Sequence, residues 1–201
     1  VGLALAGTAQ AQTDLWFGGF NDLNFSTPQN WVGGTVPTNN GNGTDTLLFT
    51  DVSSTFLNLD TAVNFAALQV YQSHTRIIGG GTLTIGAGGI TLTSSGDFAP
   101  ELDLFAPVVI TSGQTWQGSY FSINNTITGA TGGSGPLAFE NGYFSLNAAA
   151  NTFGGGLSIG DYSILRLGAS GFVQLGTGAV TMGGGSSLLI APGSSVVNGN
   201  A

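Results

Sequence analysis

The feature that most constrains the fold is a short apolar–polar alternation, which glycine interrupts along the whole chain. Residues 79–93 read GGGTLTIGAGGITLT, in which Leu83, Ile85, Ile90 and Leu92 alternate with small polar residues. An alternation with a period of two predicts strands that have one buried face. Because these strands are short, numerous and joined by small turns, they favour an all-β coil that stacks on itself.

The same alternation recurs over most of the remaining sequence. Three short strands per turn would make coils of roughly 20 to 30 residues, a length typical of solenoid repeats, so we expect six or seven coils. Glycine and asparagine are expected at the corners, where positive φ angles cost them little. Strands are predicted at residues 46–50, 56–59, 63–70, 75–78, 82–85, 90–93, 102–105, 107–111, 114–117, 120–123, 126–128, 137–139, 143–146, 157–159, 163–167, 172–175, 179–182, 187–190 and 195–197.

Charge is scarce and mostly negative. Only 6% of residues are charged, the net charge is −8, and Arg76 and Arg166 are the only arginines or lysines. Nucleic-acid binding needs several cationic phosphate contacts, and an anionic membrane surface also attracts cations, so both partners are excluded. No apolar run approaches the roughly 18 residues of a membrane span. The chain has no cysteine, which excludes disulfides and thiolate metal sites.

The chain divides into three segments by composition. Residues 1–12 (VGLALAGTAQAQ) end in an A-x-A pattern and are predicted to be the remnant of a secretory signal peptide. The alternative for this segment is an apolar arm that pairs with a neighbouring subunit's sheet edge. Residues 13–50 are predicted to be an N-terminal capping module, and residues 51–201 the β-solenoid.

The predicted cap is rich in aromatic residues. It contains Trp16, Phe17, Phe20, Phe25 and Trp31. A solenoid needs its terminal coil covered, because an open end exposes unpaired backbone and core side chains. The alternative is a glycan-binding module, in which Trp16 and Trp31 stack against sugar rings.

Several short motifs follow one another in a characteristic order. The motifs are residues 16–19 (WFGG), 24–27 (NFST), 30–31 (NW), 33–37 (GGTVP), 45–49 (DTLLF), 114–116 (QTW), 151–159 (NTFGGGLSI) and 175–182 (LGTGAVTM). Together they resemble the passengers of autotransporter-associated β-strand repeat proteins over nearly the whole chain after residue 13. The repeat signature of that family, NTFGGGLSI here, occurs only once in this chain.

The resemblance implies a right-handed parallel β-helix, exported to the surface or medium of Gram-negative-type bacteria. Many members of the family have no known enzymatic activity. We therefore expect a secreted, non-enzymatic, structural or adhesive element of the bacterial cell surface. We also expect a homo-oligomer or a filament, since an uncapped last coil invites end-to-end stacking. The residues expected to mediate self-association are Leu3, Leu5, Ala9, Leu188, Leu189, Ile190, Val196 and Val197.

Residues with catalytic or metal-binding chemistry are few. No H-E-x-x-H, G-x-S-x-G or P-loop motif is present, and His74 is expected to be a surface or turn residue. Asp97, Glu101 and Asp103 form the one carboxylate cluster, in which Glu101 and Asp103 would share a strand face. They are candidates for binding Ca²⁺, and they carry the alternative of a polysaccharide-degrading β-helix enzyme.

Overall fold

The computed structural model describes most of the chain after the first ten residues. Besides its strands it contains two short 3₁₀ turns, η1 (Pro28–Asn30) and η2 (Thr38–Gly41). The described residues are 11–19, 22–41, 43–50, 54–71, 74–94, 99–118, 125–127, 131–148, 150–168, 171–175 and 177–197.

The strands form two parallel sheets that wind around a common axis. All described pairings between named strands are parallel. The seven-stranded sheet contains β3 (Ser54–Asn58), β5 (His74–Ile78), β7 (Glu101–Leu104), β10 (Asn125–Ile127), β13 (Tyr143–Leu146), β16 (Ile164–Leu167) and β19 (Ser187–Ile190).

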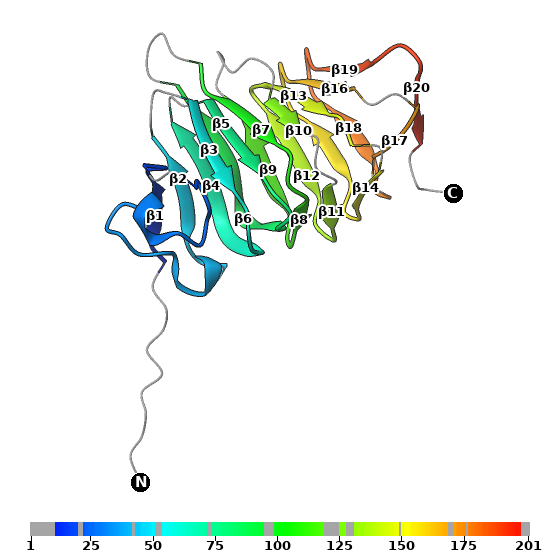
Figure 1. Cartoon of the computed structure of the whole chain (residues 1–201). Coiled ribbons are helices and arrows are strands. Elements are labelled where there is room, and N and C mark those ends of the chain that lie inside the picture. The colour runs from blue at the N-terminus through cyan, green and yellow to red at the C-terminus, as the bar shows by residue number, and fades with distance from the viewer. Residues whose placement is uncertain are drawn as a thin grey trace.

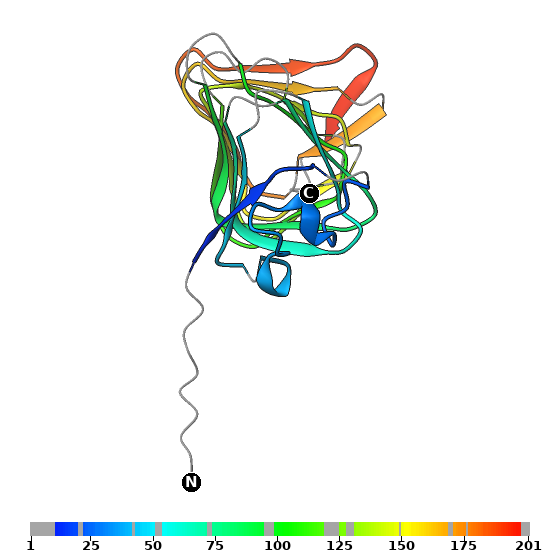
Figure 2. The ribbon, with the colours of Figure 1, turned by 60° about the vertical axis from the view of Figure 1, so that its left-hand side comes forward.

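The larger sheet has thirteen strands and folds around a corner of the coil. Figure 1 shows the strands stacked from β1 to β20, and Figure 2 shows them surrounding the axis. The strands of this larger sheet are β1 (Thr13–Trp16), β2 (Thr46–Phe49), β4 (Val63–Tyr71), β6 (Leu83–Thr93), β8 (Val108–Ile110), β9 (Gln114–Gln117), β11 (Thr131–Gly133), β12 (Leu137–Glu140), β14 (Ala150–Phe153), β15 (Leu157–Ile159), β17 (Gly171–Leu175), β18 (Val180–Met182) and β20 (Ser194–Val197).

This arrangement confirms the all-β parallel β-solenoid expected from the alternation. Each strand hydrogen-bonds to strands of neighbouring coils, so residues that face inward stack into columns along the axis. The number of coils and the handedness stay predictions.

One inward column runs through nearly the whole molecule. Each member is the register partner of the next, and all six are buried. Trp116 and Phe139 meet in this column edge to face, with their ring centroids 5.5 Å apart. The column consists of Leu47, Leu68, Ile90, Trp116, Phe139 and Ile159.

An aromatic cluster lies at the N-terminal end of the solenoid. Trp31 packs edge-on against both Trp16 and Phe25, and Phe25 packs against Phe65 of β4. The Trp31 indole Nε1 donates a hydrogen bond to the Phe25 carbonyl at 2.8 Å. The segment that carries Phe25 and Trp31 therefore packs against the strands at this end of the coil.

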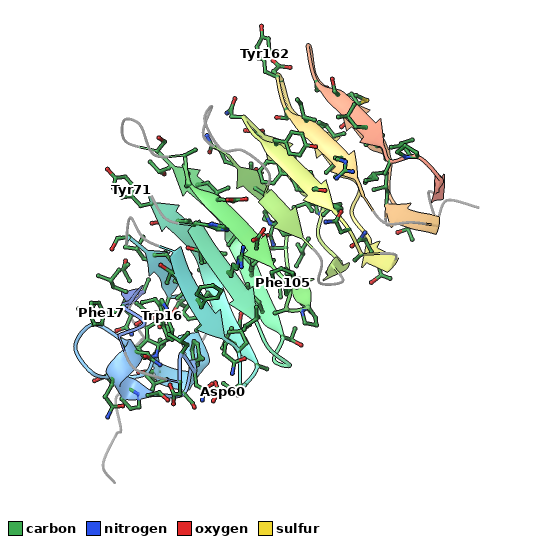
Figure 3. The ribbon with its side chains drawn as sticks, turned by 45° about the horizontal axis from the view of Figure 1, so that its top comes forward. Trp16, Phe17, Asp60, Tyr71, Phe105 and Tyr162 are labelled. Atoms are coloured by element: carbon green, nitrogen blue, oxygen red, sulfur yellow. The ribbon has the colours of Figure 1, made fainter. Side chains whose placement is uncertain are left out.

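The glycan-stacking prediction does not hold for the two tryptophans. Trp16 is 2% exposed and Trp31 is 4% exposed, so neither ring has a free face for a sugar. In Figure 3, Phe17 lies outside the cluster that contains Trp16, and its side chain is exposed. Trp16 and Trp31 are core residues: each indole ring packs into the end of the coil, and its N–H group donates a hydrogen bond to a backbone carbonyl.

Candidate functional site

Four charged or titratable side chains meet on the outer face of the seven-stranded sheet. Strands β5 and β7 pair so that His74 lies opposite Glu101 and Arg76 lies opposite Asp103. Side chains alternate between the two faces of a strand, so the residues between these four face the core. The parallel register thus brings together two pairs of residues that are far apart in the sequence.

The His74 imidazole lies between the two carboxylates. Its Nε2 atom is 3.4 Å from Glu101 Oε2 and 3.3 Å from Asp103 Oδ2. Arg76 Nε donates a hydrogen bond to the same Asp103 oxygen at 3.1 Å. The Arg76 guanidinium also lies over the Phe56 ring, 5.6 Å from its centroid. We name these four residues, His74, Arg76, Glu101 and Asp103, the β5–β7 cluster.

The structure partly reproduces the carboxylate cluster expected from the sequence. Glu101 and Asp103 share one face of β7, as predicted, and both contact His74. Asp97 lies outside the described residues. The sequence alone favours a surface or turn position for His74, but this residue lies within strand β5 and takes part in the cluster. The matching H-x-R and E-x-D spacings are the signal available in the sequence, and only the register shows that they meet.

The two carboxylates of the cluster lie close to each other. The nitrogen of His74 and the carboxylate oxygens of Glu101 and Asp103 all lie within 4.8 Å of one another. Retaining glycosidases hold their carboxyl groups about 5 to 5.5 Å apart and inverting ones about 6.5 to 9.5 Å. A surface hollow of about 550 Å³ lies elsewhere, beside Tyr143 and Tyr162, and its described lining includes no carboxylate. The polysaccharide-degrading alternative for this pair therefore stays a prediction.

Comparisons with known proteins found no match to this chain. The chain matches no family model, and no curated protein or solved structure is significantly similar to it. Within the described part of the chain, no helix has the length and apolar character needed to cross a membrane. Any assignment of function therefore rests on the sequence and the geometry of the chain itself.

A second pair of carboxylates lies at the N-terminal end of the core. Asp14 of β1 is the register partner of Leu47, so it extends the long inward column with a carboxyl group. Asp45 is buried, and one oxygen of each carboxylate is buried without a hydrogen-bond partner. Burial, with repulsion from Asp45 as the second cause, raises the pKa of Asp14 to about 6, while a hydrogen bond from Gln12 opposes the shift.

Because the pKa of Asp14 is raised in the folded chain, we expect this group to make the protein less stable at neutral pH than at mildly acidic pH. Between about pH 4 and pH 6 the folded chain keeps a proton on Asp14 that the unfolded chain has released, so the contribution of this group to stability falls as the pH rises. We expect Asp14→Asn to be more stable than the native protein at pH 7.5 by about 1 kcal/mol, a value discounted for solvent screening.

Chemical denaturation at pH 4.5, 6 and 7.5 checks this expectation. The difference between the Asp14→Asn variant and the native protein should shrink as the pH falls. Asp22 is an informative control, because hydrogen bonds from Thr27 and Asn24 lower its pKa. The contribution of Asp22 to stability should therefore change at a more acidic pH than that of Asp14. An Asp14→Asn variant that is less stable than the native protein at pH 7.5 would contradict the argument.

Proposed function

We propose that this chain is a secreted, non-enzymatic structural β-solenoid of the bacterial surface, and that it associates through the last coil that the structure describes. The observation that carries the association is the exposure of core-type side chains in the last described coil. Met182 and Ile190 follow Ile159 and Leu167 in register. Ile159 and Leu167 are buried, whereas Met182 is 52% exposed and Ile190 is 50% exposed.

The backbone at this end supports the same proposal. Strands β18, β19 and β20 are the last members of their sheet paths among the described strands. Parallel edge strands present unpaired N–H and C=O groups, which are a template for pairing with another chain. Leu188 of β19 is partly buried against the core, whereas Leu189, the register partner of Arg166, is exposed on the outer face of the strand. An apolar face of this kind, on the last described coil, is suited to packing against a similar face.

The two ends of the solenoid differ. At the N-terminal end, isolated bridges join Asn24 to Asn58 of β3 and Trp31 to Trp16 of β1, within the aromatic cluster. We propose that a second copy meets the last described coil with its own last described coil. Such a contact uses the same surface on both copies and closes as a dimer. Filaments would also require contacts at the N-terminal end.

The structure does not test the other residues expected to mediate self-association. Val196 and Val197 belong to strand β20, which is also the last described strand of its sheet path. Leu3, Leu5 and Ala9 lie outside the described residues, so the apolar arm stays a prediction.

Export to the cell surface is supported by features of the sequence. These are the signal-like residues 1–12, the family resemblance and the low charge of the chain. An adhesive role and the binding of surface glycans belong to the proposal without a residue assigned to them.

The association is tested by placing charges on the exposed core-type residues. The double variant Met182→Glu, Ile190→Glu is expected to weaken dimerisation at least tenfold, because two carboxylates from each chain would be buried at the contact. The matched control is Val32→Glu, which changes an exposed apolar residue near the opposite end. Sedimentation equilibrium from low to high micromolar concentration measures the dissociation constants.

Each result of this experiment decides between arrangements. A native dimer that the double variant loses and the control keeps supports the proposal. A native protein that stays monomeric throughout the range overturns it, as does a dimer that the double variant keeps. Filaments in negative-stain electron microscopy would overturn the closed dimer in favour of the end-to-end polymer expected from the sequence.

A further inference from the structure

In the β5–β7 cluster, one imidazole nitrogen faces two carboxylates at once. Nε2 of His74 lies 3.3 and 3.4 Å from the two carboxylate oxygens. Both distances are longer than those of charge-assisted hydrogen bonds, which are usually about 2.7 to 2.9 Å. The arrangement of these three atoms therefore also suits a cation bound between them.

The two nitrogen–oxygen distances match those between ligand atoms of a small divalent metal. In a tetrahedral site with bonds of about 2.0 to 2.1 Å, neighbouring ligand atoms lie about 3.3 to 3.4 Å apart, which follows from the tetrahedral angle. The ligand atoms of His74, Glu101 and Asp103 already lie within 4.8 Å of one another. Binding would therefore require small side-chain adjustments and no change in the pairing of β5 with β7.

The surroundings of the cluster hold one ligand in place. Asp103 is only 8% exposed, and Arg76 donates a hydrogen bond to its Oδ2 atom. Hydrogen-bond partners of this kind orient metal ligands. Arg76 also adds a positive charge, but the two carboxylates still leave the cluster with one net negative charge when His74 is neutral. The positive charge of Arg76 thus weakens the attraction of the cluster for a divalent cation, but the cluster still attracts one.

We propose that His74, Glu101 and Asp103 form a binding site for Zn²⁺ or a similar divalent transition metal, which links strand β5 to strand β7. The imidazole nitrogen selects this class of metal, because Ca²⁺ prefers a shell of six to eight oxygen ligands. This assignment replaces the Ca²⁺ expectation for Glu101 and Asp103. It does not depend on the proposed association, since the site lies within one chain and away from β18 and β19.

A metal bound here stabilises the contact between two consecutive coils. Its three ligands come from two strands that only the folded chain brings together, so the ion binds the folded state in preference to the unfolded chain. At a hundredfold excess over the dissociation constant, the midpoint of thermal unfolding should rise by about 5 to 10 °C. The increase should depend on the metal concentration.

The single histidine of the chain allows a direct test on the full-length protein without a histidine tag. ZnCl₂ is titrated while calorimetry measures the stoichiometry and NMR follows the one imidazole Hε1 signal. CoCl₂ in place of ZnCl₂ reports the coordination geometry through its visible absorption. The expected results are one site per chain, a shifted Hε1 signal and no comparable effect of CaCl₂.

Variants distinguish this site from adventitious binding. His74→Ala and Glu101→Gln should each weaken Zn²⁺ binding at least tenfold, whereas Glu140→Gln, at an exposed position on β12, should leave it unchanged. The metal-dependent increase in the unfolding midpoint should be lost in the same two variants. Absence of Zn²⁺ binding, or binding that His74→Ala leaves intact, would overturn the proposal.

Discussion

Replacing Gly89 by alanine is expected to destabilise the solenoid by about 2 to 5 kcal/mol, or to prevent folding. Strand β6 turns a corner here: its first half pairs with β8 and its second half with β9. Gly89 has a φ of +63°, and a Cβ atom would lie 2.1 Å from the Thr115 carbonyl oxygen. That oxygen belongs to the backbone next to Trp116, so relief of the clash would displace a core strand.

Two other glycines separate the contribution of the positive φ from that of the steric clash. Gly34 also has a positive φ, +67°, but a Cβ there would meet nothing within 4 Å. Gly34→Ala should therefore cost only the conformational term, about 1 kcal/mol. Gly80→Ala, in open space and without a positive φ, should change stability by less than about 0.5 kcal/mol. Urea denaturation followed by far-UV circular dichroism orders the three variants, and equal stabilities of Gly89→Ala and Gly80→Ala would refute the explanation.

Replacing Trp116 by alanine is expected to cost about 3 to 5 kcal/mol, because it leaves a large cavity in the middle of the inward column. The buried Trp116 indole also donates a hydrogen bond to Gln114 Oε1 at 2.7 Å. Gln114 in turn donates to the Ile85 carbonyl at 3.0 Å. The alanine variant therefore loses packing against Phe139 and also leaves a buried acceptor without its donor.

Trp116→Phe separates the two contributions. The phenyl ring keeps most of the packing but lacks the N–H group, so we expect a smaller loss of about 1 to 3 kcal/mol. Tyr162→Ala is the surface control: its ring is exposed and projects from the ribbon in Figure 3, and its loss should change stability by less than about 0.5 kcal/mol. If Trp116→Ala unfolds at the same urea concentration as Tyr162→Ala, the column does not have the structural role described above.

The sequence predicted that one face of each strand would be buried, which is what the inward columns require. The alternation of residues such as Leu83 and Ile85 predicted strands with one buried face, and both side chains are buried. The scarcity of charge also agrees with strands stacked about 4.8 Å apart, where like charges would repel. The prediction held because it depends on neighbouring residues and on the two-residue period of a strand.

The two candidate sites depended on information that the alternation does not contain. Glu101 and Asp103 were recognisable as a pair, but nothing local placed His74 between them. The aromatic residues Trp16 and Trp31 had two interpretations, since a ring that stacks on a sugar and a ring that fills the end of a coil have the same composition. Burial distinguished them.

The sequence alone thus determined the fold class, because strand periodicity and glycine-rich turns are local properties that act within a few residues. The tertiary structure decided which coil positions meet. An alternation repeats every two residues and so fits several registers equally well, whereas one register brings His74 to Glu101. The same stacking decided which apolar positions are covered: Leu167 and Ile190 are register partners, yet Leu167 is buried because another coil lies beyond it, while Ile190 is exposed.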